Sequence, residues 1–105
     1  MSEHIYNVTI VVNPVVEERW IQWMKEEHIP EVIETGMFTS YIFTQVILEQ
    51  EQDHPSYSIQ YRALDLESIK LYMQMYSDPL REKSAQAWGE HAIAFRTVLE
   101  VLDEK

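Results

Sequence analysis

His28 has surroundings that favour acid–base chemistry. It follows Trp20 and Met24 at intervals of four residues, so it extends the apolar face of a predicted helix, which Pro30 then interrupts. Burial favours neutral imidazole, whereas a helix end and nearby carboxylates favour imidazolium. These opposing effects can leave a histidine that exchanges protons near neutral pH, as a general acid or base at a pocket mouth. The alternative is a structural histidine that caps carbonyls freed by Pro30. The nearby carboxylates belong to Glu26, Glu27 and Glu31.

Aromatic residues are candidates for the wall of a pocket beside His28. Trp20 and Trp23 lie on the same predicted helix, and Trp88 ends the second one. Tyr61 lies on a predicted strand. An apolar, aromatic pocket between sheet and helices, with His28 at its polar end, suits a planar organic ligand. The alternative is that these rings belong to the core.

Arg96 is the candidate for binding an anion. It lies four residues before Glu100 on a predicted strand, so both point to one face of the sheet. We expect that face to be the one that no helix covers. One interpretation is an anion or carboxylate site built on Arg96, and the other is a set of satisfied hydrogen bonds across a dimer interface. The polar residues expected to converge there from two other strands are Asn7, Thr9, Gln60 and Arg62.

Metal and phosphate chemistry have little support in the sequence. The chain has no cysteine, and its four histidines are scattered without the spacing of a ligand pair. Asn13-Pro14-Val15-Val16 stands where a glycine-rich anion loop would follow the first strand. We therefore expect no metal and no cofactor.

The order of the patterned segments predicts the architecture that positions these residues. Alternating and 3.6-residue patterns follow one another as βαββαβ, which is typical of a ferredoxin-like α+β domain filling residues 1–105. We expect a four-stranded antiparallel sheet with two helices on one face. Pro30 should kink or break the first helix. Asp65 should cap the second helix, which should restart at Asp78-Pro79 with Asp78 as the new cap. The predicted strands are about 4–13, 38–50, 56–63 and 92–102, and the predicted helices are about 15–35 and 65–88.

The sheet face without helices is expected to be too apolar for water. The usual solution is a two-fold homodimer whose sheets face one another as a dimeric α+β barrel. We place these residues on that face: Asn7, Thr9, Val11, Tyr41, Phe43, Gln60, Arg62, Arg96, Val98, Glu100 and Leu102.

Charge and hydropathy exclude several classes of partner. A formal net charge of −10 repels phosphate backbones and anionic membrane surfaces, so we expect no nucleic acid partner. No apolar run approaches the roughly 18 residues that a membrane helix needs. No secretory signal is visible at the beginning of the sequence, and we expect a cytoplasmic protein.

Four motifs spread along the chain occur together: Trp20-x-x-Trp23-Met24-x-x-x-His28-Ile29-Pro30-Glu31-Val32, Thr35-Gly36-x-Phe38, Tyr6-Asn7-Val8-Thr9 and Phe95-Arg96-Thr97. With these motifs the chain resembles the DUF4286 family of small, uncharacterised bacterial proteins. The resemblance implies a bacterial cytoplasmic protein and supplies no reaction. A looser resemblance, carried by His28 and Pro30, is to EthD-type dimeric α+β barrel proteins, in which the first helix also ends in a His-x-Pro segment.

Two functions fit these observations. The first is a dimeric protein that binds or converts a small planar organic ligand, with His28 as its catalytic candidate. Trp20, Trp23, Tyr61, Trp88 and Arg96 are the ligand-binding candidates. The second is a non-catalytic dimeric module for interaction or metabolite sensing, which the lack of a phosphate loop and of paired catalytic carboxylates favours.

Overall fold

The elements follow the predicted order, with both helical stretches divided into shorter pieces. The structure is a computed structural model that describes residues 2–47 and 53–105. Residues 48–50 of the second predicted strand lie outside the described residues. The strands are β1 (His4–Val12), β2 (Ser40–Gln45), β3 (Ser56–Ala63) and β4 (Ala92–Glu100). The helical segments are η1 (Pro14–Val16), α1 (Glu17–Trp23), η2 (Met24–His28), α2 (Ile29–Glu34), α3 (Leu66–Met75), α4 (Ser77–Trp88) and η3 (Gly89–His91).

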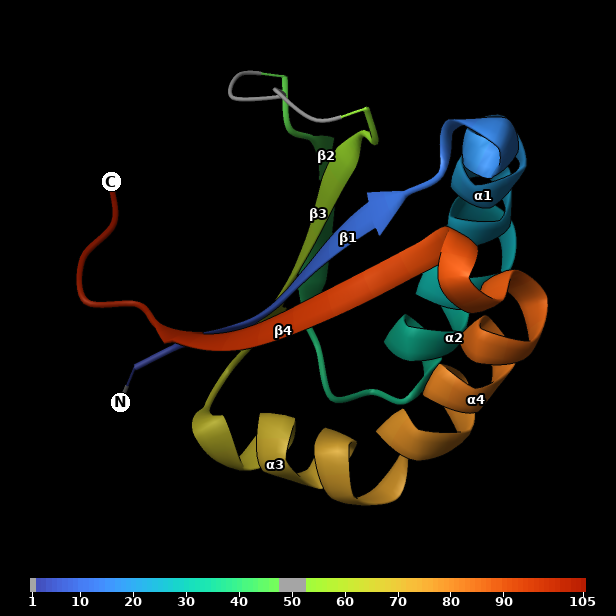
Figure 1. The fold of residues 1–105 in the computed structure, drawn as a ribbon. Helices are drawn as coiled ribbons and strands as arrows, with labels where there is room; N and C mark the ends of the chain where they lie inside the picture. Colours follow the sequence, from blue (N-terminus) through green and yellow to red (C-terminus); the bar gives the residue numbers. More distant parts are fainter. Residues whose placement is uncertain (1, 48–52) are drawn as a thin grey trace.

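The strands form one antiparallel sheet in the order β2-β3-β1-β4. Figure 1 shows the helices on one side of this sheet and no described helix on the other. The predicted ferredoxin-like α+β architecture is therefore confirmed. Strand β1 lies at the centre, so its alternating residues decide which side chains meet the helices.

The core lies between the sheet and the helices. Tyr6, Val8, Ile10 and Val12 of β1 are buried there, as the period of two predicts for a strand with one covered face. Burying this apolar surface is the main favourable contribution to folding. The other core residues include Tyr57, Ile59, Tyr61 and Ala63 of β3, together with Trp20, Met24, Ile29, Val32, Ile69, Tyr72 and Leu80 of the helices.

The first helical stretch contains one turn of π-helix, η2, where the sequence predicts a kink or a break. Pro30 has no N–H to donate to the carbonyl of Glu26, so the α-helical ladder is interrupted at that carbonyl. The N–H of Ile29 instead donates to the carbonyl of Met24, five residues back. The helix then continues as α2 to Glu34. The proline therefore widens one turn and does not end the helix.

The second helical stretch breaks at Tyr76, where φ is −123°. Asp65 caps its beginning as predicted, because its side chain accepts a hydrogen bond from the N–H of Ser68 at 2.9 Å. The helix restarts close to the predicted position, since α4 begins at Ser77. It has no side-chain cap, so the prediction that Asp78 caps it is wrong. Ser77 donates its hydroxyl to the carbonyl of Met73, which joins the two helices across the break.

The pairing of β4 with β1 corrects the predicted assignment of the two sheet faces. Arg96 pairs with Val8, so it points to the side of the helices and not to the uncovered side. Val98 and Glu100 share its side, because they alternate with it along β4. Tyr41 and Phe43 pair with Tyr61 and Ile59 and also lie on the helix side. Leu102 lies beyond the end of β4.

The uncovered face of the sheet combines polar and apolar side chains. Asn7 lies at its centre and bonds with Thr9, Ser58 and Thr97. The large apolar residues Ile42, Ile93, Phe95 and Leu99 share this face and are exposed, Phe95 to 60%. The predicted membership of Asn7, Thr9, Val11, Gln60 and Arg62 is confirmed by the pairing. The expected convergence of these residues with Arg96 is wrong.

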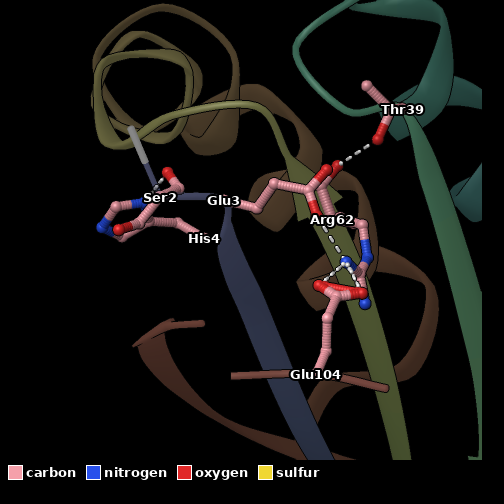
Figure 2. A network of polar contacts seen from close by, with 6 residues as sticks. All are labelled: Ser2, Glu3, His4, Thr39, Arg62 and Glu104. Atoms are coloured by element: carbon pink, nitrogen blue, oxygen red, sulfur yellow. Dashed lines mark hydrogen bonds and ion pairs between the residues drawn. The ribbon is translucent and has the colours of Figure 1, made fainter. Parts of the chain in front are cut away.

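Arg62 holds both ends of the chain against β3 on the uncovered face. Its Nη1 atom lies 2.5 Å from a carboxylate oxygen of Glu3 and 3.0 Å from one of Glu104 (Figure 2). Its carbonyl accepts hydrogen bonds from the N–H and the hydroxyl of Thr39. The two carboxylates raise the pKa of Arg62. Arg62 is thus occupied by structural contacts.

Replacing Asp65 with Ala tests the helix cap. The variant loses the acceptor for the N–H of Ser68, so its melting temperature should fall by about 4 °C. Asp65→Asn is the matched control, because an asparagine oxygen also caps helices and should keep the melting temperature within about 1 °C. Equal losses in both variants, measured by circular dichroism, would contradict capping as the role of this residue.

Candidate functional site

A small cavity lies between the sheet and the helices. Its volume is about 40 Å³, enough for about three water molecules. Aromatic rings of Tyr6, Trp20, Tyr61 and Tyr72 line it. The exposed residues of its lining, Arg81 and Arg96, belong to α4 and β4, so the cavity opens between these two elements.

His28 reaches the cavity from the last residue of the π-helical turn. Its ring stacks on Trp23, with centroids 5.1 Å apart and planes 22° apart. Its Nδ1 atom is buried and has no hydrogen-bond partner among the described residues. A buried polar atom without a partner costs stability, and such atoms are rare outside functional sites or sites of bound water.

Burial lowers the pKa of His28 to about 4. Glu31 opposes this effect, but its carboxylate is paired with Lys83 at 2.6 Å. The positive charges of Arg96 and Lys83 lower the pKa further. Burial therefore decides the balance that the sequence left open, and His28 is neutral at pH 7. Such a histidine is a good hydrogen-bond acceptor and a weak general base.

Three tyrosine hydroxyls add polar groups to the cavity lining. Tyr6, Tyr61 and Tyr72 make no hydrogen bond through their hydroxyls to any residue in the described ranges. Burial raises the pKa of Tyr61 and of Tyr72, so both stay protonated at neutral pH. Each hydroxyl can donate a hydrogen bond to a guest molecule.

Four of the six predicted site residues line one cavity: His28, Trp20, Tyr61 and Arg96. Trp23 and Trp88 do not line it. Trp23 supports the ring of His28, and Trp88 packs edge-on against Trp23 with ring centroids 5.8 Å apart. The indole N–H of Trp88 is buried without a partner in the described part of the chain. Arg96 joins His28 at the cavity because of the β4 register.

Helix α4 contributes site residues that the sequence analysis missed. Ser77, Leu80, Arg81 and Ser84 line the cavity, spaced at i, i+3, i+4 and i+7. This is the period of one helix face, but three of its four members are polar. Apolar periodicity therefore does not identify this helix face. The pattern that could have identified it is the helical spacing of the small and cationic residues Ser77, Arg81 and Ser84.

No group of three or more metal-ligating side chains occurs within residues 2–47 and 53–105. The cavity instead offers one neutral imidazole, three phenolic hydroxyls and two guanidinium groups around an aromatic lining. In the same two ranges, no helix combines the length and apolar character needed to cross a bilayer.

Residues 3–102 match the family described as a domain of unknown function, DUF4286. The chain belongs to the DUF4286 family. This membership confirms the resemblance seen in the sequence motifs. No curated protein matches this DUF4286 chain.

Solved structures share the fold of this DUF4286 protein at low sequence identity. A dimeric ferredoxin-like protein from an uncultured marine organism has a TM-score of 0.72 and 15% identity, with all of both chains covered. SnoaB, a cofactor-independent oxygenase from Streptomyces nogalater, has a TM-score of 0.69 and 10% identity over 99% of this chain and 97% of its own. An EthD family protein from Bacillus halodurans has a TM-score of 0.62 and 14% identity over 92% of this chain and 97% of its own. These similarities establish the fold.

A pH titration of stability tests the burial of His28. The unfolded chain protonates this residue below about pH 6.5, whereas the folded chain does so only near pH 4. Wild-type protein should therefore lose about 3 kcal/mol of unfolding free energy through this residue as the pH falls from 6.5 to 4. His28→Gln, which cannot titrate, should lack this loss.

The measurement is urea unfolding of both proteins at several pH values between 4 and 7. The difference in stability between wild type and His28→Gln removes the contribution of all other titrating groups. A difference that stays constant over this range would show that the His28 ring is not held neutral.

Proposed function

We propose that this protein binds a small planar organic ligand in the cavity between α4 and β4. The observation that carries the proposal is the pairing of an aromatic lining with unpartnered polar atoms, the Nδ1 of His28 foremost. A ligand that accepts from the tyrosine hydroxyls and donates to His28 would satisfy these groups. The aromatic side chains of Trp20 and Tyr61 suit a planar ligand, because offset and edge-on contacts between aromatic rings are favourable.

The cavity volume sets how such a ligand would lie. About 40 Å³ accommodates a hydroxyl or one edge of a ring, but not a whole aromatic molecule. The remainder of the ligand would lie in the opening, beside Ser84 and Arg96. The ligand would therefore enter edge first and stay partly accessible from the α4–β4 side.

His28 acts in this proposal as a hydrogen-bond acceptor in the lining of the cavity. Its lowered pKa keeps the imidazole neutral, so one ring nitrogen is free to accept. A ligand hydroxyl is the fitting donor. Conversion of the ligand through proton transfer to His28 would need a bound group that raises this pKa, such as a nearby negative charge.

Phenol is a suitable neutral probe for this site. At a Kd on the order of 1 mM, it should shift the NMR signals of the His28 and Ala94 amides and of the Trp20 indole N–H. Ala94→Leu fills the lining and should abolish these shifts. Ala85→Leu makes the same substitution at an exposed position of α4 and should leave them unchanged. Shifts that persist in Ala94→Leu would place binding elsewhere, and their absence in wild type would contradict the proposal.

We also propose that the uncovered sheet face forms a two-fold homodimer. Solved structures with this fold include dimeric ferredoxin-like proteins. The face carries four exposed large apolar residues around the Asn7 hydrogen-bond network, and it is hollowed beside Ile42 and Gln60. Pairing of this face with its copy would remove that apolar surface from water. A dimeric interaction or sensing module, the alternative function, would use the same interface.

Replacing Phe95 with Glu tests the interface. A carboxylate at the centre of an apolar contact loses hydration on association, so the dimer should dissociate. Sedimentation velocity should give the mass of one chain for Phe95→Glu and twice that mass for wild type. Leu71→Glu, at an exposed position on α3, is the control and should remain dimeric. A wild-type mass of one chain at micromolar concentration would contradict the proposal.

A further inference from the structure

The cavity has a charge opposite to that of the chain. The sequence has 18 acidic and eight basic residues, with a net charge of −10. The cavity lining nevertheless contains Arg81 and Arg96 and, among the described residues, no aspartate or glutamate. The lining of this cavity in an acidic protein therefore consists of cationic and neutral residues. This distribution favours an anion and rejects a cation.

Both arginines have free hydrogen-bonding capacity. Neither guanidinium makes an ion pair or a hydrogen bond with any side chain or carbonyl in the described ranges. Arg62, in contrast, is held by two carboxylates. A guanidinium offers donors in a planar fork that matches a carboxylate. Arg81 and Arg96 stand on the two elements that border the opening, so an anion there meets one fork from each side.

The buried part of the cavity has the opposite preference. Aromatic and aliphatic side chains such as Trp20, Tyr61 and Ile59 form it, and an ion buried there would lose its hydration. The ring of a ligand belongs in this part, and its charged group belongs at the exposed opening. The polarity of the site thus fixes the direction in which a ligand lies.

We propose that the ligand is a monocyclic aromatic carboxylate, whose ring enters the cavity and whose carboxylate lies at the opening between Arg81 and Arg96. This inference rests on the proposed function of the cavity and adds the chemical class and orientation of its ligand. Both parts of the molecule are required. The ring supplies burial against Trp20 and Tyr61, and the carboxylate supplies charge-assisted hydrogen bonds.

Three probes separate these contributions: benzoate, benzamide and acetate. Benzamide has the shape of benzoate without its charge, and acetate has the charge without the ring. NMR titration of the full chain at physiological salt should show benzoate binding about tenfold more tightly than benzamide. Acetate should bind at least about tenfold more weakly than benzoate, because it buries no ring.

Variants of the two arginines assign the charge recognition. Arg96→Gln and Arg81→Gln should each weaken benzoate binding about tenfold and weaken benzamide binding clearly less, because the amide oxygen carries no net charge. Arg19→Gln is the matched control, because Arg19 is exposed on α1 and does not line the cavity. It removes the same net charge and should leave both affinities unchanged.

The outcomes distinguish the inference from the function on which it rests. Equal affinity for benzoate and benzamide would overturn the carboxylate and leave a planar-ligand site. Equal affinity for benzoate and acetate would overturn the ring, since it would show ion pairing at the surface alone. A benzoate affinity that falls equally in Arg19→Gln would assign the effect to net charge and overturn the roles of Arg81 and Arg96. Failure of both aromatic probes to shift any cavity signal would overturn the proposed function itself.

Discussion

The register between β4 and the central strand β1 is the constraint on which both surfaces of this protein depend. Val8 opposite Arg96 and Ile10 opposite Ala94 put the small and cationic residues of β4 beneath the helices. The same register sends Ile93, Phe95 and Leu99 to the other side. A shift of one residue would exchange these two sets completely, because side chains alternate along a strand. It would fill the cavity and remove the apolar character of the opposite face.

The sequence predicted the fold because its periodic signals are strong and agree with one another. Strand β3 occupies the predicted residues, the Asp65 cap is formed, and the inward residues Trp20, Met24 and Ile69 are buried. The face of β4 was assigned wrongly for a physical reason. Large apolar residues normally mark the core side of a strand, but here Ala92 and Ala94 face the helices. The space left by these small side chains belongs to the cavity, and the large residues lie on the uncovered face.

The candidate site was predicted in part, since His28, Trp20 and Tyr61 came from helix and strand periodicity. Arg96 was chosen for its chemistry but placed on the wrong face, and Arg81 was missed. Met73 shows the limit of periodicity in another way: it follows the buried Ile69 of α3 by four residues, yet it is 43% exposed. The protonation of His28 also required coordinates, because the weight of burial against nearby charges depends on distances that a sequence does not contain.

The cavity combines features that a purely structural core avoids. An orphaned imidazole nitrogen reduces stability relative to an apolar filling, and two exposed arginines without a partner among the described residues stand at the opening. Local departures from the rules of packing concentrate at functional sites. The distribution of charge also sets the cavity apart, because the chain is acidic as a whole and no carboxylate of the described residues lines this cavity.

The wide turn η2 accommodates one residue more than an ordinary α-helical turn. The inward residues of this stretch are Trp20, Met24, Ile29 and Val32, and the step from Met24 to Ile29 spans five residues where the neighbouring steps span four and three. Deleting one residue from 25–27 would restore the four-residue spacing of an α-helix and leave Ile29 and Val32 on the core side. A chain of this family that lacks one residue here would therefore keep the same apolar pattern on both sides of the gap. An alignment gap at this position would mark the loss of the wide turn that ends in His28.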